Sequence, residues 1–171
     1  MRACLGRRYR LSASHRLFCE SFSDAENQKV YGKCANPYGH GHNYTVEVIV
    51  GGEIDRATGM VCNLAELDAL VGREVLEPFD HQNLNTLERF RAAVPTTENL
   101  VIEIRNRLKR ALPQRLTLGV RVEETSNNFF EYWEEAAKGD WRQTFSKRRL
   151  AGSEQESSKN RAKNQMKTSE K

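Results

Sequence analysis

The chain has only four histidines in 171 residues, and three of them are spaced as a metal site requires. His40 and His42 flank Gly41, and side chains two residues apart in an extended segment project from one face. Their bases then lie about 7 Å apart, which allows two imidazole nitrogens to converge on one ion. His15, at the end of a predicted neighbouring strand, supplies a third nitrogen. Three histidines that leave one coordination position open are typical of catalytic zinc.

The alternative for His-Gly-His is a pair of surface histidines on a strand, and His15 alone is a still weaker indication. The fourth histidine changes this balance, because Asp80 and His81 place an acid beside an imidazole. A proton-transfer relay requires such a pair. The alternative for Asp80 and His81 is an ordinary pair of loop residues.

Cys34 is the cysteine with a predicted chemical role. A thiol near a bound cation and beside Lys33 has its thiolate favoured, so Cys34 is a candidate base near neutral pH. The four cysteines show no framework spacing, and we expect all of them to be free thiols. The other three, Cys4, Cys19 and Cys62, are expected to pack as small apolar side chains without a chemical role.

The elements that must position these residues follow from hydrophobic patterning. Residues 6–17 and 43–50 predict two strands that pair, and the polar segment 19–37 between them predicts a long functional loop. A helix is predicted from the Asn63 cap to about Leu76, where Pro78 stops it.

A second helix is predicted to open at residues 96–98, where Thr96 and Thr97 offer capping hydroxyls, and to end before Pro113. Its buried stripe contains Leu100, Ile104, Leu108 and Ala111. Strands at residues 116–124 and 129–133 then form a hairpin. The predicted class is α+β: an antiparallel four-stranded sheet with two helices between strands 2 and 3, packed on one face.

The positive charge of the chain is concentrated at its end. Residues 146–171 contain eight Lys and Arg against three Glu, although the whole chain carries only +4. We expect one domain at residues 1–145 and a basic, disordered tail at residues 146–171. The near-neutral domain argues against a nucleic-acid-binding protein. The absence of a signal peptide or of about 20 consecutive apolar residues predicts a cytoplasmic protein without a membrane span.

Six motifs together resemble the 6-pyruvoyltetrahydropterin synthase family, in order and along nearly the whole chain up to the tail. They are Ser-Ala-Ser-His-Arg-Leu (12–17), Tyr-Gly-Lys-Cys-Ala-Asn-Pro-Tyr-Gly-His-Gly-His-Asn-Tyr (31–44), Gly-Glu-Ile-Asp-Arg-Ala-Thr-Gly-Met-Val (52–61), Asp-His-Gln-Asn-Leu (80–84), Pro-Thr-Thr-Glu-Asn-Leu (95–100) and Glu-Thr-Ser-Asn-Asn (124–128). The resemblance implies the tunnelling fold (T-fold), in which subunits pair their sheets into a barrel. It also implies a homohexamer, a dimer of trimers, with active sites between subunits.

The implied reaction is zinc-dependent conversion of 7,8-dihydroneopterin triphosphate to 6-pyruvoyl-5,6,7,8-tetrahydropterin with release of triphosphate, as in tetrahydrobiopterin biosynthesis. Carried over by motif, Cys34 is the base, and Asp80 and His81 form the relay for the second proton. Glu124 would anchor the pterin, since a carboxylate accepts from two adjacent nitrogen donors. Thr96 and Thr97 have two open roles, substrate binding and helix capping. Arg16 and Lys33 are among the cations that could meet the triphosphate.

Two alternatives to this reaction stay open. The related 6-carboxy-5,6,7,8-tetrahydropterin synthase shares the fold, metal ligands and substrate, but resembles a pattern with three residues between the cysteine and His-Gly-His. Here five residues separate Cys34 from His40, which matches the pyruvoyl-forming type. The second alternative is a pterin-binding module without turnover. Two departures from the family pattern are the basic tail and Glu123, where an aromatic residue is common.

Overall fold

The structure, a computed structural model, describes residues 1–134. The predicted tail at residues 146–171 and the last part of the predicted domain lie outside the described residues. The described chain forms one five-stranded sheet in the order β3-β1-β2-β4-β5. Its strands are β1 (Arg2–His15), β2 (His40–Glu53), β3 (Gln82–Asn83), β4 (Thr117–Glu123) and β5 (Phe129–Trp133).

The four predicted strands are present, and the predicted sheet lacked only β3. This two-residue strand runs parallel to β1 and pairs with Ala13 and Ser14, whereas the other pairings are antiparallel. A two-residue strand is too short to show the alternation by which strands are recognised in a sequence. β1 and β2 are also longer than predicted, because their ladder continues through charged and glycine-containing segments from Arg2↔Glu53 to His15↔His40.

The first predicted helix is present, but the prediction that Pro78 stops it was wrong. Asn63 caps α2 (Leu64–Val71), a π-helical turn follows at Gly72–Leu76, and α3 (Glu77–Phe79) continues the same helical path. The amide of Glu77 donates to the carbonyl of Gly72, five residues back, as in a π-helix. Pro78 directly follows this π-helical turn, at the start of α3, where the change in hydrogen-bond pattern accommodates a residue without an amide proton.

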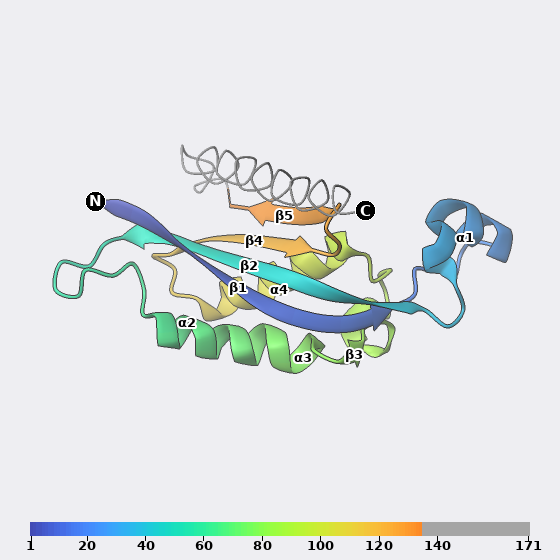
Figure 1. Cartoon of the computed structure of the whole chain (residues 1–171), viewed down its shortest axis with the longest axis horizontal. Helices are drawn as coiled ribbons and strands as arrows, with labels where there is room; N and C mark the ends of the chain where they lie inside the picture. The colour runs from blue at the N-terminus through green and yellow to red at the C-terminus, as the bar shows by residue number, and fades with distance from the viewer. Residues whose placement is uncertain (135–171) are drawn as a thin grey trace, which may run out of the picture. The chain divides into compact units, whose positions relative to one another are not determined.

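The second predicted helix, α4 (Thr97–Ala111), has the predicted boundaries, with the Thr96 hydroxyl accepting from the amide of Asn99. Figure 1 shows α2, α3 and α4 on one side of the sheet. No helix in residues 1–134 has both the length and the apolar composition needed to cross a bilayer.

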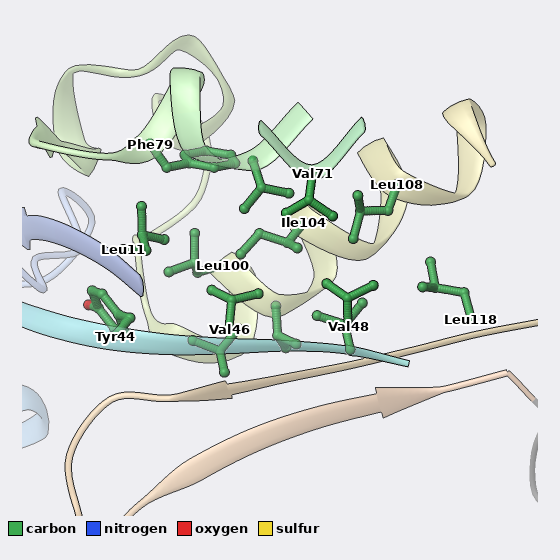
Figure 2. Close-up of a cluster of buried hydrophobic side chains, with 14 of the residues drawn as sticks. Leu11, Tyr44, Val46, Val48, Val71, Phe79, Leu100, Ile104, Leu108 and Leu118 are labelled. Atoms are coloured by element: carbon green, nitrogen blue, oxygen red, sulfur yellow. The ribbon is translucent and has the colours of Figure 1, made fainter. Parts of the chain in front are cut away.

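The core lies between one face of the sheet and these helices. Figure 2 shows Leu100, Ile104 and Leu108 of α4 directed at Val46 and Val48 of β2, all with no exposed surface. Val71 and Phe79 complete the same cluster from α2 and α3. Side chains on β2 alternate between faces, so His40, His42 and Tyr44 share the face of Val46 and Val48. The histidines therefore stand at the end of the core rather than on the opposite face.

The segment predicted as a loop, residues 19–37, contains a helix. α1 (Asp24–Tyr31) begins with a capping box between Ser23 and Glu26, and a 3-10 turn follows at Gly32–Ala35. The buried Asn27 bonds to the amide and the carbonyl of Cys19 and to the carbonyls of Phe22 and Ser23. The excursion between β1 and β2 is therefore an ordered element that holds Cys34 near the end of the sheet.

Candidate metal centre and active site

Three histidines meet where β1 ends and β2 begins. The register places His15 directly opposite His40, and His42 lies on the same face two residues further along. One nitrogen from each ring lies within 4.8 Å of the other two. The ring centroids are 4.7 Å apart for His15–His40 and for His40–His42, and 5.2 Å apart for His15–His42. The predicted ligand set therefore converges on one point.

A hydrogen bond on the side of the ring away from the cluster orients His15 for metal binding. Its Nδ1 lies 2.8 Å from the carbonyl oxygen of Pro95, which can only accept, so Nδ1 carries the proton and Nε2 is left for an ion. Burial lowers the pKa of His15 and of His42. Neutral imidazole is the form that binds metal, so both rings are held in the competent state. The sequence offered no signal for the contact with Pro95.

Glu124 lies beside the histidine cluster. Its Oε1 is 3.7 Å from Nε2 of His42 and 3.9 Å from Nε2 of His15. The Thr97 hydroxyl donates to Oε1, and the Asn128 amide donates to Oε2 at 2.7 Å. Burial alone would raise the pKa of Glu124, but these two hydrogen bonds and the neighbouring histidines lower it overall. A fixed, ionised carboxylate therefore stands next to the candidate metal position.

The structure separates the roles of the two predicted threonines. The Thr97 side chain is 3% exposed and its hydroxyl is committed to Glu124. The Thr96 hydroxyl caps α4 instead. Asn128, which holds the second oxygen of Glu124, lies between the two strands of the predicted hairpin and was not predicted as a site residue. Its place in a hairpin turn gave no indication of a bond back to residue 124.

Tyr44 completes the inner wall of the site. Its ring is fully buried, 5.4 Å from the His42 ring and 6.5 Å from the His15 ring. Burial, and then the charge of Glu124, raise the pKa of its hydroxyl. Tyr44 therefore supports the metal-facing histidines from the core side.

Cys34 is partly exposed on the 3-10 turn, and its carbonyl accepts from the amide of Leu17 at 2.8 Å. Among the protein's own groups, burial and then the charge of Glu124 raise the pKa of its thiol. The sequence predicted a favoured thiolate beside a bound cation, and this stays a prediction. Activation of Cys34 therefore requires a cation close enough to outweigh both effects.

Asp80 and His81 form the predicted pair. Oδ2 of Asp80 lies 3.1 Å from Nδ1 of His81, and Oδ1 accepts from the amide of Ser12 at 2.8 Å. His81 has a positive φ of 58°, and its amide donates to the carbonyl of Ser12. The bond from Ser12 lowers the pKa of Asp80. His81 is 81% exposed at its side chain and shares the lining of a pocket of about 500 Å³ with His42.

The fold and the site define an α+β protein with a three-histidine metal-binding cluster, a fixed carboxylate beside it and an acid–imidazole pair. The family model for 6-pyruvoyl tetrahydropterin synthase matches residues 4–135. The chain therefore belongs to the 6-pyruvoyl tetrahydropterin synthase family, has the T-fold, and is a lyase of this type.

Individual relatives agree with this assignment. The chain is 48% identical over 131 residues to the 6-pyruvoyl tetrahydrobiopterin synthase of Homo sapiens, covering 76% of this chain and 90% of the relative. The solved 6-pyruvoyl tetrahydropterin synthase of Caenorhabditis elegans superposes with a TM-score of 0.74 at 40% identity, covering 79% of this chain and 97% of that one. A putative 6-carboxy-5,6,7,8-tetrahydropterin synthase of Archaeoglobus fulgidus is 35% identical over 112 residues, covering 65% and 88%.

Proposed function

We propose that this lyase is zinc-dependent and converts 7,8-dihydroneopterin triphosphate to 6-pyruvoyl-5,6,7,8-tetrahydropterin, releasing triphosphate for tetrahydrobiopterin-type biosynthesis. The observation that carries the proposal is the juxtaposition of Glu124 with the three histidines, within 4 Å of two of them. A pterin anchor beside a metal site suits a substrate whose hydroxylated side chain is attached directly to the pterin ring.

The donor set supports zinc as the metal. Two nitrogens bound at about 2.05 Å to one tetrahedral zinc lie about 3.3 Å apart. Nε2 of His15 and Nε2 of His40 are 3.2 Å apart. Neutral imidazoles with an open fourth position match a catalytic zinc, held by His15, His40 and His42. When bound, zinc would polarise the side-chain hydroxyl oxygens of the substrate.

The residues around the metal have separate tasks in this proposal. Glu124 accepts from two nitrogen donors on the amino-pyrimidine edge of the pterin, while Thr97 and Asn128 keep its carboxylate ionised and oriented. Cys34 takes a proton from the substrate side chain as its base. His81, oriented by Asp80, handles the second proton. No external reductant is needed, because the rearrangement is internal.

We also propose that the working form is a homohexamer with active sites between subunits. Among the described residues, the outer edge of β1 pairs with another strand only at Ala13 and Ser14, and the backbone of Ser12 bonds to Asp80 and His81. Residues 2–11 therefore present open backbone groups. Such an edge is suited to pairing with another copy. The exposure of His81 supports a site completed by a neighbouring subunit. The four free cysteines agree with the cytoplasm as the proposed compartment.

A second candidate reaction forms the 6-carboxy product. The Archaeoglobus fulgidus relative carries that name and matches over a shorter segment at lower identity. The spacing of five residues between Cys34 and His40 favours the pyruvoyl product, since it sets where the thiol stands relative to the metal. A binding module without turnover would retain the anchor but have no need for Cys34, Asp80 and His81.

The deciding experiment incubates protein of measured metal content with dihydroneopterin triphosphate, follows triphosphate release and determines the product mass. A pyruvoyl product with stoichiometric zinc supports the proposal. A carboxy product would assign the chain to the second reaction. Tight pterin binding without triphosphate release would leave only the binding module.

A further inference from the structure

A second pocket, of about 750 Å³, lies next to the metal site. It is formed by loops at the end of the sheet and borders His15 and Pro95, the residue whose carbonyl holds His15. Glu124 and Thr97 are not among its lining residues. The pocket and the pterin anchor are therefore separate, and His15 borders both.

One arginine in this pocket is fixed from several sides. The side-chain oxygen of Asn85 accepts from the amide of Arg16 at 2.7 Å, and its NH₂ group donates to the carbonyl of Arg16 at 2.9 Å. Nε of Arg16 donates to the carbonyl of Ala35 at 3.1 Å, and the guanidinium stacks over the Phe18 ring at 4.1 Å. A guanidinium held in this way loses little further freedom when it binds an anion.

The charge of Arg16 has no partner in the described part of the chain. Its fixed bonds use backbone carbonyls and an aromatic face, and no ion pair within residues 1–134 includes it. Arg91 adds a second positive charge to the lining, and Glu20 carries the only carboxylate among the described lining residues. The pocket of His81, in contrast, has no Arg or Lys among its described lining residues. Of these two pockets, the Arg16 pocket is the one with anion-binding chemistry.

We infer that the pocket of Arg16 and Arg91 binds the triphosphate of the substrate, an inference that rests on the proposed function. The substrate carries its parts in the order pterin ring, hydroxylated carbons, terminal triphosphate. The site presents Glu124, the histidine cluster and the Arg16 pocket in the same order. Arg16 supplies paired N–H donors to phosphate oxygens, and the hydroxyl and amide groups of Ser14 and Asn83 line the same space.

The test uses the full, zinc-loaded chain, and the zinc content is measured after each titration so that removal of zinc by phosphate is detected. Calorimetric titration with inorganic tripolyphosphate is compared for the wild type, Arg16→Gln and Arg56→Gln. Arg56 is an exposed residue in the turn after β2, far from the site, and its substitution removes the same charge. We expect Arg16→Gln to bind tripolyphosphate about tenfold or more weakly, because it loses a charge-assisted contact. Arg56→Gln should bind it as tightly as the wild type.

The outcomes separate the inference from its alternatives. An equal loss in both variants, or no binding by the wild type, would overturn it. If Arg16→Gln fails to fold, Arg91→Gln decides, since it leaves the clamp of Asn85 intact, and an unchanged affinity there would also overturn it.

A second measurement links the pocket to the substrate. In zinc-loaded enzyme, Arg16→Gln is expected to raise KM for dihydroneopterin triphosphate about tenfold or more, while the affinity for dihydroneopterin without phosphates changes less than twofold. Equal losses for both pterins would show that Arg16 only supports the fold and would refute the subsite. If the wild type does not turn over the substrate, the proposed function fails, and the tripolyphosphate titration still decides whether the pocket binds phosphate.

Discussion

Replacing Thr97 by Val tests whether the carboxylate of Glu124 is the pterin anchor. Val has nearly the same shape but lacks the hydroxyl that donates to Oε1 of Glu124. A hydrogen bond to a charged group contributes about 1.5 to 3 kcal/mol. Glu124 would keep only its bond from Asn128, so its orientation toward a pterin would no longer be fixed. We therefore expect pterin affinity to fall by roughly 10-fold to 150-fold.

Thr96→Val is the matched control, because Thr96 is the adjacent residue but serves only as the cap of α4. Loss of a capping hydroxyl costs about 1 kcal/mol of stability. Both variants should unfold more easily than the wild type, whereas only Thr97→Val should bind dihydroneopterin more weakly. Fluorescence titration and thermal unfolding measure the two effects separately, and Thr97→Ser should restore binding. If both variants lost pterin affinity equally, the assignment of Thr97 and Glu124 as a binding unit would be wrong.

Three further predictions follow from the site and its surroundings. Cys34→Ala should abolish turnover but keep zinc content and pterin binding, because the thiol is proposed as a base; loss of zinc in this variant would contradict that role. His40→Ala should remove the metal, measured by elemental analysis, and with it the thermal stabilisation that zinc gives the wild type. Asp68→Asn should reduce stability near neutral pH, since hydrogen bonds from Arg7 and then Tyr9 lower the pKa of Asp68 below 3.8. A carboxyl whose pKa is lowered on folding contributes stability above its unfolded-state pKa, and this contribution is lost as pH falls through the folded-state pKa. The difference between Asp68→Asn and the wild type should therefore shrink on acidification, and a difference that does not change with pH in denaturant titrations would refute the prediction.

The sequence predicted those parts of the fold that depend on local patterning. The buried stripe of α4 and its Thr96 cap produced correct helix boundaries, because apolar periodicity and a capping hydroxyl both act within a few residues. The His-Gly-His spacing likewise fixed which ligands share a face. His15 could be assigned to the cluster only because a strand ends there.

Other features depended on contacts between distant segments and could not be predicted. The parallel pairing of β3 with β1 joins residues nearly seventy positions apart in the chain. The hydrogen bonds of His15 to the Pro95 carbonyl and of the Arg16 amide to Asn85 have no signature in either segment. The helix α1 was different, because its Ser23–Glu26 capping box is a local feature, and the prediction of a loop rested only on the polar composition of the segment.

The pairing of His15 with His40 also closes the hairpin of β1 and β2, with residues 16–39 as its loop. Closing a flexible loop of this length has an entropic cost that grows with the logarithm of its length. An ion held by both histidines would fasten the base of the loop, so metal binding and formation of the last rung of the ladder would be one thermodynamic event. Metal content would then report whether the two strands are in register, since a slip of one residue turns His15 to the opposite face. The excursion that carries Cys34 would be tethered by the same ion that activates it.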